Sequence, residues 1–352
     1  MSDPRNYTVG WICAVMVEFV AAQEFLDQAH GQPTIIHPDD ENSYALGSIG
    51  GHNVVIAILP DAAYGVPSAA RAAGNMMMSF PNVRFGLMVG IGGGAPSKKN
   101  DIRLGDLVIS VPSDGEQGAF EYELKNTVRG RTWEVTKRLD PPPIILSSAV
   151  ATLRTHFVGN GHRIHQAVEA VLARNPRMRG EFQRPLPDTD RLFKSEVDYD
   201  PSRRLDARDL LTRRTRATHE NPTIHYGTIA SANSLMKMAT IRDELIAQKN
   251  VLCFEMEAAG LMNSFPSLVI RGICDYSDSH KNDVWQGYAA MVAAAYAIEL
   301  LNTIAPSMVE AQRTIQEIAA ATQDVIIASY TNGEKGKNEE VTSRKIENVD
   351  VN

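Results

Sequence analysis

Short runs rich in β-branched residues alternate with longer helix-like stretches, and this alternation constrains the fold more than any other feature. We expect strands at residues 8–15, 44–49, 53–59, 85–89, 107–111, 223–230, 251–255 and 268–274. We expect helices at residues 17–27, 67–78, 240–248, 258–264 and 285–304. Such alternation indicates an α/β fold. The prediction is one domain at residues 7–305, with a central mixed, twisted sheet flanked by helices in three α/β/α layers.

Residues 114–221 interrupt this pattern. The segment contains Pro141, Pro142 and Pro143, and Arg and Lys outnumber Asp and Glu between residues 150 and 220. We expect a helical insertion, whose basic side chains either face an anionic ligand or form a solvated surface. Residues 306–352 are expected to be helical at first and then a disordered tail or linker.

Composition excludes several classes of function. The formal net charge of −7 and the pI near 5.8 disagree with a general nucleic-acid binder, which needs a basic face. Cys13, Cys253 and Cys274 lack the spacing of a disulfide framework or a zinc site. The longest membrane-like run, residues 288–301, is too short to span a bilayer and contains Glu299. We expect a cytoplasmic protein that has no cofactor and no membrane or nucleic-acid partner.

A glycine-rich stretch, Gly90-Ile91-Gly92-Gly93-Gly94-Ala95, follows a predicted strand and matches the loose pattern of dinucleotide-binding loops. Pro96 follows at once, so no helix begins there whose N-terminus could bind a pyrophosphate. No Gly-Lys-Ser/Thr sequence ends the stretch, which excludes a P-loop. We expect a loop whose backbone closely approaches either a ligand or another segment of the chain.

Acidic residues follow three predicted strands: Glu18 the first, Glu255 and Glu257 a later one, and Asp275 the last. One such residue alone is commonly explained by the dipole of the next helix. Ligands of parallel α/β sheets bind at the carboxyl ends of strands, where these residues meet. Carboxylates accept hydrogen bonds from sugar hydroxyls, and one can deliver a proton to a base. The sequence therefore predicts a site for a hydroxyl-rich, nitrogenous ligand, with Arg271 in its apolar strand paired with Glu18.

Five short motifs occur in a fixed order along the chain. They are Gly10-Trp-Ile-Cys-Ala-Val-Met-Val-Glu18, Gly90-Ile-Gly-Gly-Gly94, Gly227-Thr-Ile-Ala-Ser-Ala-Asn-Ser-Leu235, Phe254-Glu-Met-Glu-Ala258 and Arg271-Gly-Ile-Cys-Asp275. In this order they resemble the nucleoside phosphorylase superfamily, of the methylthioadenosine nucleosidase and purine nucleoside phosphorylase type. Residues 44–57 and 64–70 are similar to the branch that supplies amino-terminal domains of fungal NLR-like proteins. The resemblance covers about residues 7–304 but not the insertion.

The resemblance implies a role for each matching residue. Asp275 would protonate N7 of a purine and make the base a better leaving group, while Glu257 would bind the ribose hydroxyls. Met256 would pack against the sugar and Glu255 would lie near its far side. The remaining substrate-binding positions would be Gly92, Gly93, Asn233, Leu235 and Met236, of which the last two would line the base pocket.

Two positions bear on whether water or phosphate attacks the sugar. Phosphorylases of the superfamily usually place an Arg and a Ser where this chain has Met88 and Ile91, neither of which can bind phosphate. Hydrolytic relatives also keep a serine at the Ile91 position. Glu18, paired with Arg271, would position and deprotonate a water. We therefore expect a purine nucleoside N-ribohydrolase that cleaves adenosine to base and ribose, with inosine and guanosine also open.

Three other functions stay open at this stage. The basic insertion, with His280 and Lys281, is compatible with cleavage of 5′-phosphorylated nucleotides such as ATP or AMP. A phosphate-dependent purine nucleoside phosphorylase is the second alternative, and a nucleoside-sensing module of an NLR-like protein is the third. The resemblance also implies a homo-oligomer in which neighbouring subunits complete the sugar end of the pocket.

Overall fold

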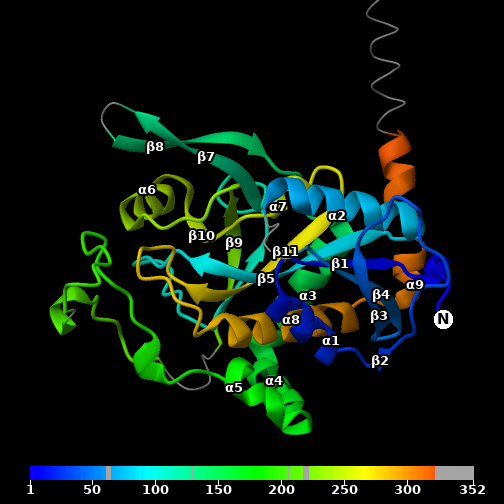
Figure 1. Ribbon diagram of the computed structural model, residues 1–352, viewed down its shortest axis with the longest axis horizontal. Helices are drawn as coiled ribbons and strands as arrows, with labels where there is room; N and C mark the ends of the chain where they lie inside the picture. The colour runs from blue at the N-terminus through cyan, green and yellow to red at the C-terminus, as the bar shows by residue number, and fades with distance from the viewer. Residues whose placement is uncertain (61–64, 128–129, 205, 217–221, 322–352) are drawn as a thin grey trace, which may run out of the picture.

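The computed structural model of the chain describes residues 1–60, 65–127, 130–204, 206–216 and 222–321. Within these residues the strands form one 11-stranded mixed sheet, with helices on both of its faces (Figure 1). The structure therefore confirms the predicted α/β fold with a central mixed sheet.

The strands follow the order β2-β3-β4-β1-β5-β11-β6-β9-β7-β8 across the sheet, and β10 pairs with both β5 and β9. Their bounds are β1 Val9–Cys13, β2 Gln28–Ala29, β3 Ser43–Ile49, β4 His52–Ile58, β5 Phe85–Gly94, β6 Leu107–Ser110, β7 Ala119–Thr127, β8 Gly130–Arg138, β9 Ile224–Ser231, β10 Val251–Glu255 and β11 Ser267–Asp275. The four neighbours β4, β1, β5 and β11 run parallel. Strands β5 and β11 are buried almost throughout, which explains their continuous apolar sequences.

Helices pack on both faces of this sheet. Their bounds are α1 Met16–Glu24, α2 Val66–Ser79, α3 Ile144–Asn160, α4 Ile164–Arg174, α5 Arg179–Phe182, α6 Ala239–Lys249, α7 Ala258–Leu261, α8 Gln286–Asn302 and α9 Pro306–Glu310. The alanine-rich α8 packs against β5 and β11 together with α1, and α2 packs with α7 on the opposite face (Figure 1). Because α8 is surrounded by other elements, it is apolar on nearly all sides.

The glycine-rich stretch is not the loop that we expected. It is the C-terminal half of β5, which continues without interruption to Gly94. One edge of β5 pairs with β11, and the other edge pairs first with β1 and then with β10. These neighbours pair with the backbone of the glycine stretch, and the N–H of Ile91 between β1 and β10 donates to the side chain of Glu18, so no loop forms there.

The segment at residues 114–221 contains the expected helices α3, α4 and α5, but it also contains the hairpin of β7 and β8. Strand β7 adds to the sheet by pairing in parallel with β9. Its apolar residues Phe120, Tyr122 and Leu124 recur at every second position, which is the period of a strand, and the first two are buried. The hairpin therefore extends the sheet, as Figure 1 shows, and the segment is not a purely helical insertion.

The last part of the described chain is helical, with α9 followed by further helical residues as far as residue 321. The predicted disordered tail lies outside the described residues. In the ranges that the structure describes, no single helix has the length and apolar character needed to cross a membrane. Among the described residues one pair, α8 and Pro306–Ala321, reaches that length and apolar character together, and the two helices meet at a bend of 86°. The three cysteines are free and buried.

Candidate active site

A cavity of about 390 Å³ gathers most of the predicted site residues. Its lining consists of Ala14, Val15, Glu18, Ile91, Gly92, Gly93, Leu235, Phe254, Glu255, Met256, Glu257, Cys274, Asp275, Lys281, Asp283 and Gln286. Segments that are far apart in the sequence, from β1 to the start of α8, therefore contribute to one concave site. Concave sites of this volume are typical of small-ligand pockets.

The strand arrangement explains why the acidic residues converge. Strand β1 runs parallel to β5 and ends beside Met88, whereas β10 runs antiparallel to β5 and approaches from Gly94. The carboxyl ends of β1 and β10 therefore point toward each other along the same edge of β5. The convergence at one edge was predicted from the strand ends, and in the structure it arises from one parallel neighbour of β5, β1, and one antiparallel neighbour, β10.

Arg271 lies on β11, opposite Gly90 of β5, and its side chain is fully buried among three glutamates. Its Nη2 lies 2.5 Å from Oε2 of Glu255 and 3.1 Å from Oε2 of Glu257. Its Nη1 lies 3.7 Å from Oε1 of Glu18. Glu18 is therefore only the most distant of three partners and not the main one that we expected. Buried carboxylates without a partner are costly, and here a single guanidinium offsets part of the repulsion among three of them.

Glu255 and Glu257 have different surroundings. Glu255 accepts hydrogen bonds from the backbone N–H groups of Glu257 and Ala258, at 3.1 and 3.0 Å to Oε2, and so holds the start of α7. Glu257 accepts from Arg271 through Oε2 at 3.1 Å and also from the backbone of Met256. Burial, reinforced by repulsion from Glu255 and Glu18 and opposed by Arg271, raises the pKa of Glu257 to about 7. Its side chain makes no capping hydrogen bond to α7 and lines the cavity, so Glu257 is the carboxylate of the cluster that is best placed to accept hydrogen bonds from a ligand.

Glu18 is held by three backbone donors. Its Oε2 accepts from the N–H groups of Ala14 and Val15, at 2.6 and 3.2 Å, and its Oε1 accepts from Ile91 N–H at 2.8 Å. Burial raises the pKa of Glu18, while Arg271 and the three N–H donors oppose that rise. A carboxylate with a raised pKa in a cavity wall is suited to accept a proton from a water.

The glycines of β5 create the space that these side chains occupy. A Cβ at Gly90 would collide with Glu18 and would lie 2.6 Å from Nη1 of Arg271. A Cβ at Gly93 would collide with Ser277 and would lie 2.7 Å from Oδ1 of Asp275. The sequence left open whether a ligand or another segment approaches this backbone. The charged side chains of the site itself approach it.

Asp275 ends β11, and its carboxylate contacts Ser277, Lys281 and the thiol of Cys274, which donates to Oδ2 at 3.4 Å. Oδ1 accepts from the backbone N–H of Ser277 at 2.8 Å, and Oδ2 accepts from Nζ of Lys281 at 2.8 Å. Ser277 adopts a left-handed φ of 54°, which is rare for a residue with a side chain and directs its N–H to the carboxylate. Burial lowers the pKa of Lys281, but the ion pair with Asp275 outweighs it and leaves that pKa above its ordinary value.

Sequence reasoning did not identify Ser277, and it connected Lys281 with phosphate binding instead of with Asp275. The position of Lys281 in the sequence offered a signal. It lies six residues after Asp275, and the loop after β11 brings it back to the end of that strand. The conformation of Ser277 had no such signal, since neither a glycine nor an asparagine marks it.

Two predicted substrate-binding residues lie away from the cavity. Asn233 accepts a hydrogen bond from the N–H of Val66 at 3.3 Å and so contacts the start of α2. Met236 is buried in a small hydrophobic cluster that also contains Phe120 and Phe254. Leu235, in contrast, lines the cavity and is 38% exposed, so it presents apolar surface to the cavity.

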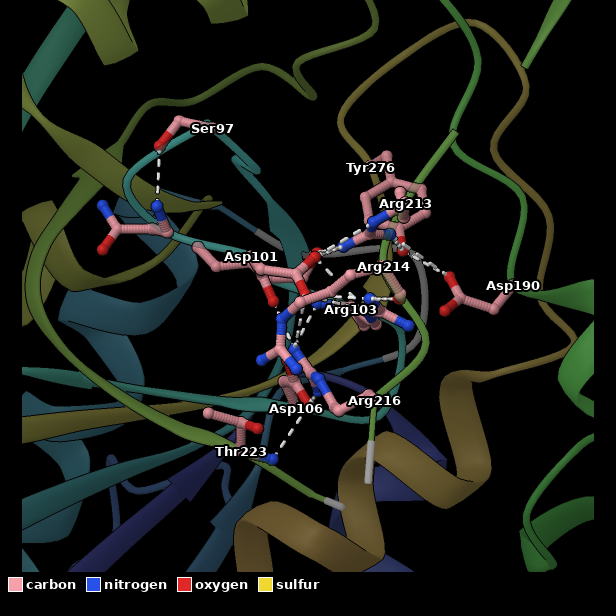
Figure 2. A network of polar contacts seen from close by, with 12 residues as sticks. Ser97, Asp101, Arg103, Asp106, Asp190, Arg213, Arg214, Arg216, Thr223 and Tyr276 are labelled. Atoms are coloured by element: carbon pink, nitrogen blue, oxygen red, sulfur yellow. Dashed lines mark hydrogen bonds and ion pairs between the residues drawn. The ribbon is translucent and has the colours of Figure 1, made fainter. Parts of the chain in front are cut away.

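Several arginines of residues 114–221 pair with carboxylates of the chain itself. Figure 2 shows Arg213 and Arg216 beside Asp101 and Asp106. Arg213 Nη2 lies 2.7 Å from Asp101 Oδ1, and Arg216 Nη1 lies 2.6 Å from Asp106 Oδ1. Further pairs join Arg179 to Glu169, Arg203 to Asp209 and Arg208 to Asp206. These pairs favour a structural role over a surface for an anionic ligand.

The chain was compared with known proteins by sequence. No protein-family model matches the chain. A nucleotide-binding leucine-rich repeat (NLR)-like protein of Hyaloscypha variabilis is 45% identical over 313 residues, which make up 89% of this chain. The chain spans 31% of the length of that relative.

Solved structures of two nucleosidases share the fold. Futalosine hydrolase of Helicobacter pylori is 12% identical, with a TM-score of 0.53 over 85% of this chain and 99% of that one. The 5′-methylthioadenosine/S-adenosylhomocysteine nucleosidase of Neisseria meningitidis, in complex with methylthio-immucillin-A, is 17% identical, with a TM-score of 0.53 over 84% of this chain and 99% of that one. The chain thus has the fold of these two nucleosidases, and it is similar in sequence to part of an NLR-like protein.

Proposed function

We propose that the protein is a purine nucleoside N-ribohydrolase. Asp275 acts as the acid at N7 of the purine, Glu257 binds the ribose hydroxyls, and Glu18 positions the attacking water. The observation that carries the proposal is that one cavity contains the carboxylate cluster around Arg271 together with Asp275. The shared fold with nucleosidases supports it.

The chemistry of the reaction matches these residues. When the bond between C1′ and N9 breaks, its electron pair moves to the purine, and protonation at N7 by Asp275 makes the base a neutral leaving group. The ribose becomes an oxocarbenium-like cation, which the carboxylates of Glu255 and Glu257 stabilise. Water then bonds to C1′ while its proton passes to Glu18. The net products are the free purine and ribose.

Water is favoured over phosphate because of the residues that line the cavity. Within the described part of the chain, the lining contains five carboxylates, Glu18, Glu255, Glu257, Asp275 and Asp283, but Lys281 is its one lysine or arginine. Met88 is fully buried in β5 and Ile91 presents an apolar side chain, so neither supplies a donor for phosphate. A phosphate dianion would be repelled by this lining.

The same charge distribution favours a nucleoside over a nucleotide. The basic segment, with His280 and Lys281, made a 5′-phosphorylated substrate an alternative from the sequence, and two of its arginines, Arg213 and Arg216, are bound to Asp101 and Asp106. Lys281 is bound to Asp275. A triphosphate would therefore meet more carboxylates than free cations. We expect adenosine to be cleaved with a higher kcat/KM than ATP.

Product analysis with and without phosphate tests the proposal. The purified protein is incubated with adenosine, inosine, guanosine, AMP or ATP in phosphate-free buffer, and base and sugar are separated by chromatography. Free ribose in the absence of phosphate supports hydrolysis. Strict dependence on phosphate, with ribose 1-phosphate as the product, would contradict it and identify a phosphorylase.

A nucleoside-sensing module is the second candidate. The NLR-like protein of Hyaloscypha variabilis, to which this chain is similar, is longer, and the chain spans 31% of it. In a sensing module the cavity binds a purine nucleoside without turning it over. Calorimetric binding of adenosine together with an absence of base release would favour the sensor.

A further inference from the structure

A second cavity, of about 350 Å³, lies next to the proposed active site. It shares Asp275 and Lys281 with the first cavity. The rest of its lining is Leu104, Thr189, Arg191, Phe193, Tyr199, Tyr276, Asp278, Ser279, His280 and Asn282. The two spaces are therefore neighbours that meet at the proposed acid.

Aromatic rings form much of the wall of the second cavity. The rings of Phe193 and His280 are stacked, with centroids 3.7 Å apart and planes at 11°. Tyr199 meets the same histidine ring edge-on at 6.0 Å. The side chain of His280 is 6% exposed, and neither of its ring nitrogens has a hydrogen-bond partner among the described residues. Phe193 is buried as well, whereas Tyr199 is 57% exposed at the mouth of the wall. An aromatic wall with unsatisfied ring nitrogens is suited to a flat ligand group.

This wall is held in place by contacts from the segment at residues 114–221. Arg213 donates to the hydroxyl of Tyr276 at 2.5 Å, and that hydroxyl donates to Asp190, as Figure 2 shows. The N–H of Tyr199 donates to Ser279 Oγ at 2.8 Å, which joins the segment to the loop after β11. The cavity is thus built by defined contacts and does not depend on a ligand to form it.

The positions of the atoms on a purine ring determine which group of the ligand reaches the second cavity. N7 and the exocyclic group on C6 lie on the same edge of the purine ring system. If Asp275 contacts N7, as the proposed function requires, the C6 group lies beside Asp275 and Lys281, where the second cavity begins. Lys281 is the movable part of this boundary, because its side chain is long and 24% exposed.

We propose that the second cavity receives a planar substituent on C6, so that purine nucleosides with an enlarged 6-amino group are substrates. The inference rests on the proposed function, because it takes the position of the purine from Asp275. The aromatic wall of Phe193, Tyr199 and His280 then packs against the substituent, and Leu104 closes the apolar side.

Relative turnover of N6-benzyladenosine and adenosine tests the proposal. We expect the wild-type protein to cleave N6-benzyladenosine with a kcat/KM within about tenfold of that for adenosine. The substitution Leu104→Trp, which fills the second cavity, should lower the ratio of the two kcat/KM values by about tenfold or more. Val158→Trp is the matched control, because Val158 is 85% exposed on α3 and touches neither cavity.

The outcomes separate the two proposals. Cleavage of adenosine with a rate for N6-benzyladenosine that is lower by more than about tenfold would overturn the second-cavity proposal alone. An unchanged ratio in a folded Leu104→Trp variant would also overturn it. Absence of cleavage for both nucleosides would contradict the hydrolase proposal itself. Because the readout is a ratio measured on the same protein, a partial loss of folded protein does not affect it.

Discussion

Nζ of Lys281 donates to Oδ2 of Asp275 across 2.8 Å, so the residue that we propose as the acid is paired with a cation. Together with the N–H of Ser277, which donates to Oδ1, the lysine fixes the position of this carboxyl. A substrate that displaces Lys281 would therefore release one of the contacts that hold Asp275. The contact thus links substrate binding to the position of the acid.

Replacing this lysine should weaken catalysis through the position of the acid. In Lys281→Met the donor to Oδ2 of Asp275 is lost, so the carboxyl is held by fewer contacts. We expect kcat for adenosine to fall by about tenfold. Lys281→Arg keeps a donor and should retain more of the activity. Equal kcat values in all three proteins would show that Lys281 does not act through Asp275.

Glu257 should lower the stability of the folded protein while it contributes to substrate binding. Its pKa is about 7 in the folded protein, against an ordinary value of 4.5, because burial and two neighbouring carboxylates disfavour ionisation. The folded protein therefore binds more protons than the unfolded chain between these values, and stability falls as the pH rises through this window. Glu257→Gln removes the penalty, so we expect it to be more stable by roughly 1–3 kcal/mol at about pH 8, with a smaller gain at about pH 5.

Urea denaturation of the wild type and Glu257→Gln at the two pH values checks the stability effect. Cleavage assays on the same samples should show that kcat/KM for adenosine falls by about 100-fold, because an amide binds the ribose hydroxyls less strongly and stabilises a cation poorly. A variant that is less stable at both pH values would contradict the assignment of Glu257 as a strained, functional carboxylate.

Arg271 should be essential for folding stability. Arg271→Met leaves three buried carboxylates without their shared partner, so we expect a loss of about 3–5 kcal/mol in the free energy of unfolding. Arg208→Met is the matched control, since Arg208 is 91% exposed and its pair with Asp206 lies at the surface. Chemical denaturation compares the two. If both variants unfold at the same denaturant concentration, the cluster does not hold the site together.

Gly93→Ala should reduce catalysis more than stability. The added methyl group collides with Ser277 and approaches Oδ1 of Asp275, so the acid must shift. Because displacing a proton donor by a small distance costs much of its effect, we expect kcat to fall by about 100-fold. In Gly74→Ala, which has no neighbour within 4 Å of the new methyl group, α2 should instead become more stable by about 0.5–1 kcal/mol. If Gly93→Ala keeps the kcat of the wild type, the exact position of Asp275 does not control the reaction, and the prediction is wrong.

Much of the fold follows from local sequence pattern. The hairpin of β3 and β4, the helix α2 and the apolar strand β11 lie where period and turn residues predict them, because each depends on contacts that repeat along a short segment. The glycine stretch of β5 could not be predicted in this way. Its conformation depends on β10 and β11, which are distant in the sequence, and glycine by itself favours a loop.

The candidate site was predictable in its residues but not in its contacts. Glu18, Glu257 and Asp275 could be selected because acids at strand ends are visible in the sequence. The sharing of Arg271 among three glutamates depends on the opposed directions of β1 and β10, which no local pattern contains. The contact between Lys281 and Asp275 likewise depends on the path of one loop.

Release of the purine base by the wild type and by Asp275→Asn, in phosphate-free buffer, tests the central claim most directly. Calorimetry with adenosine on the same preparations shows whether both proteins still bind the nucleoside. We predict that the wild type releases adenine and ribose, and that Asp275→Asn binds adenosine but releases adenine about 100-fold more slowly or less. Equal rates in the two proteins, or binding without any release by the wild type, would contradict the account.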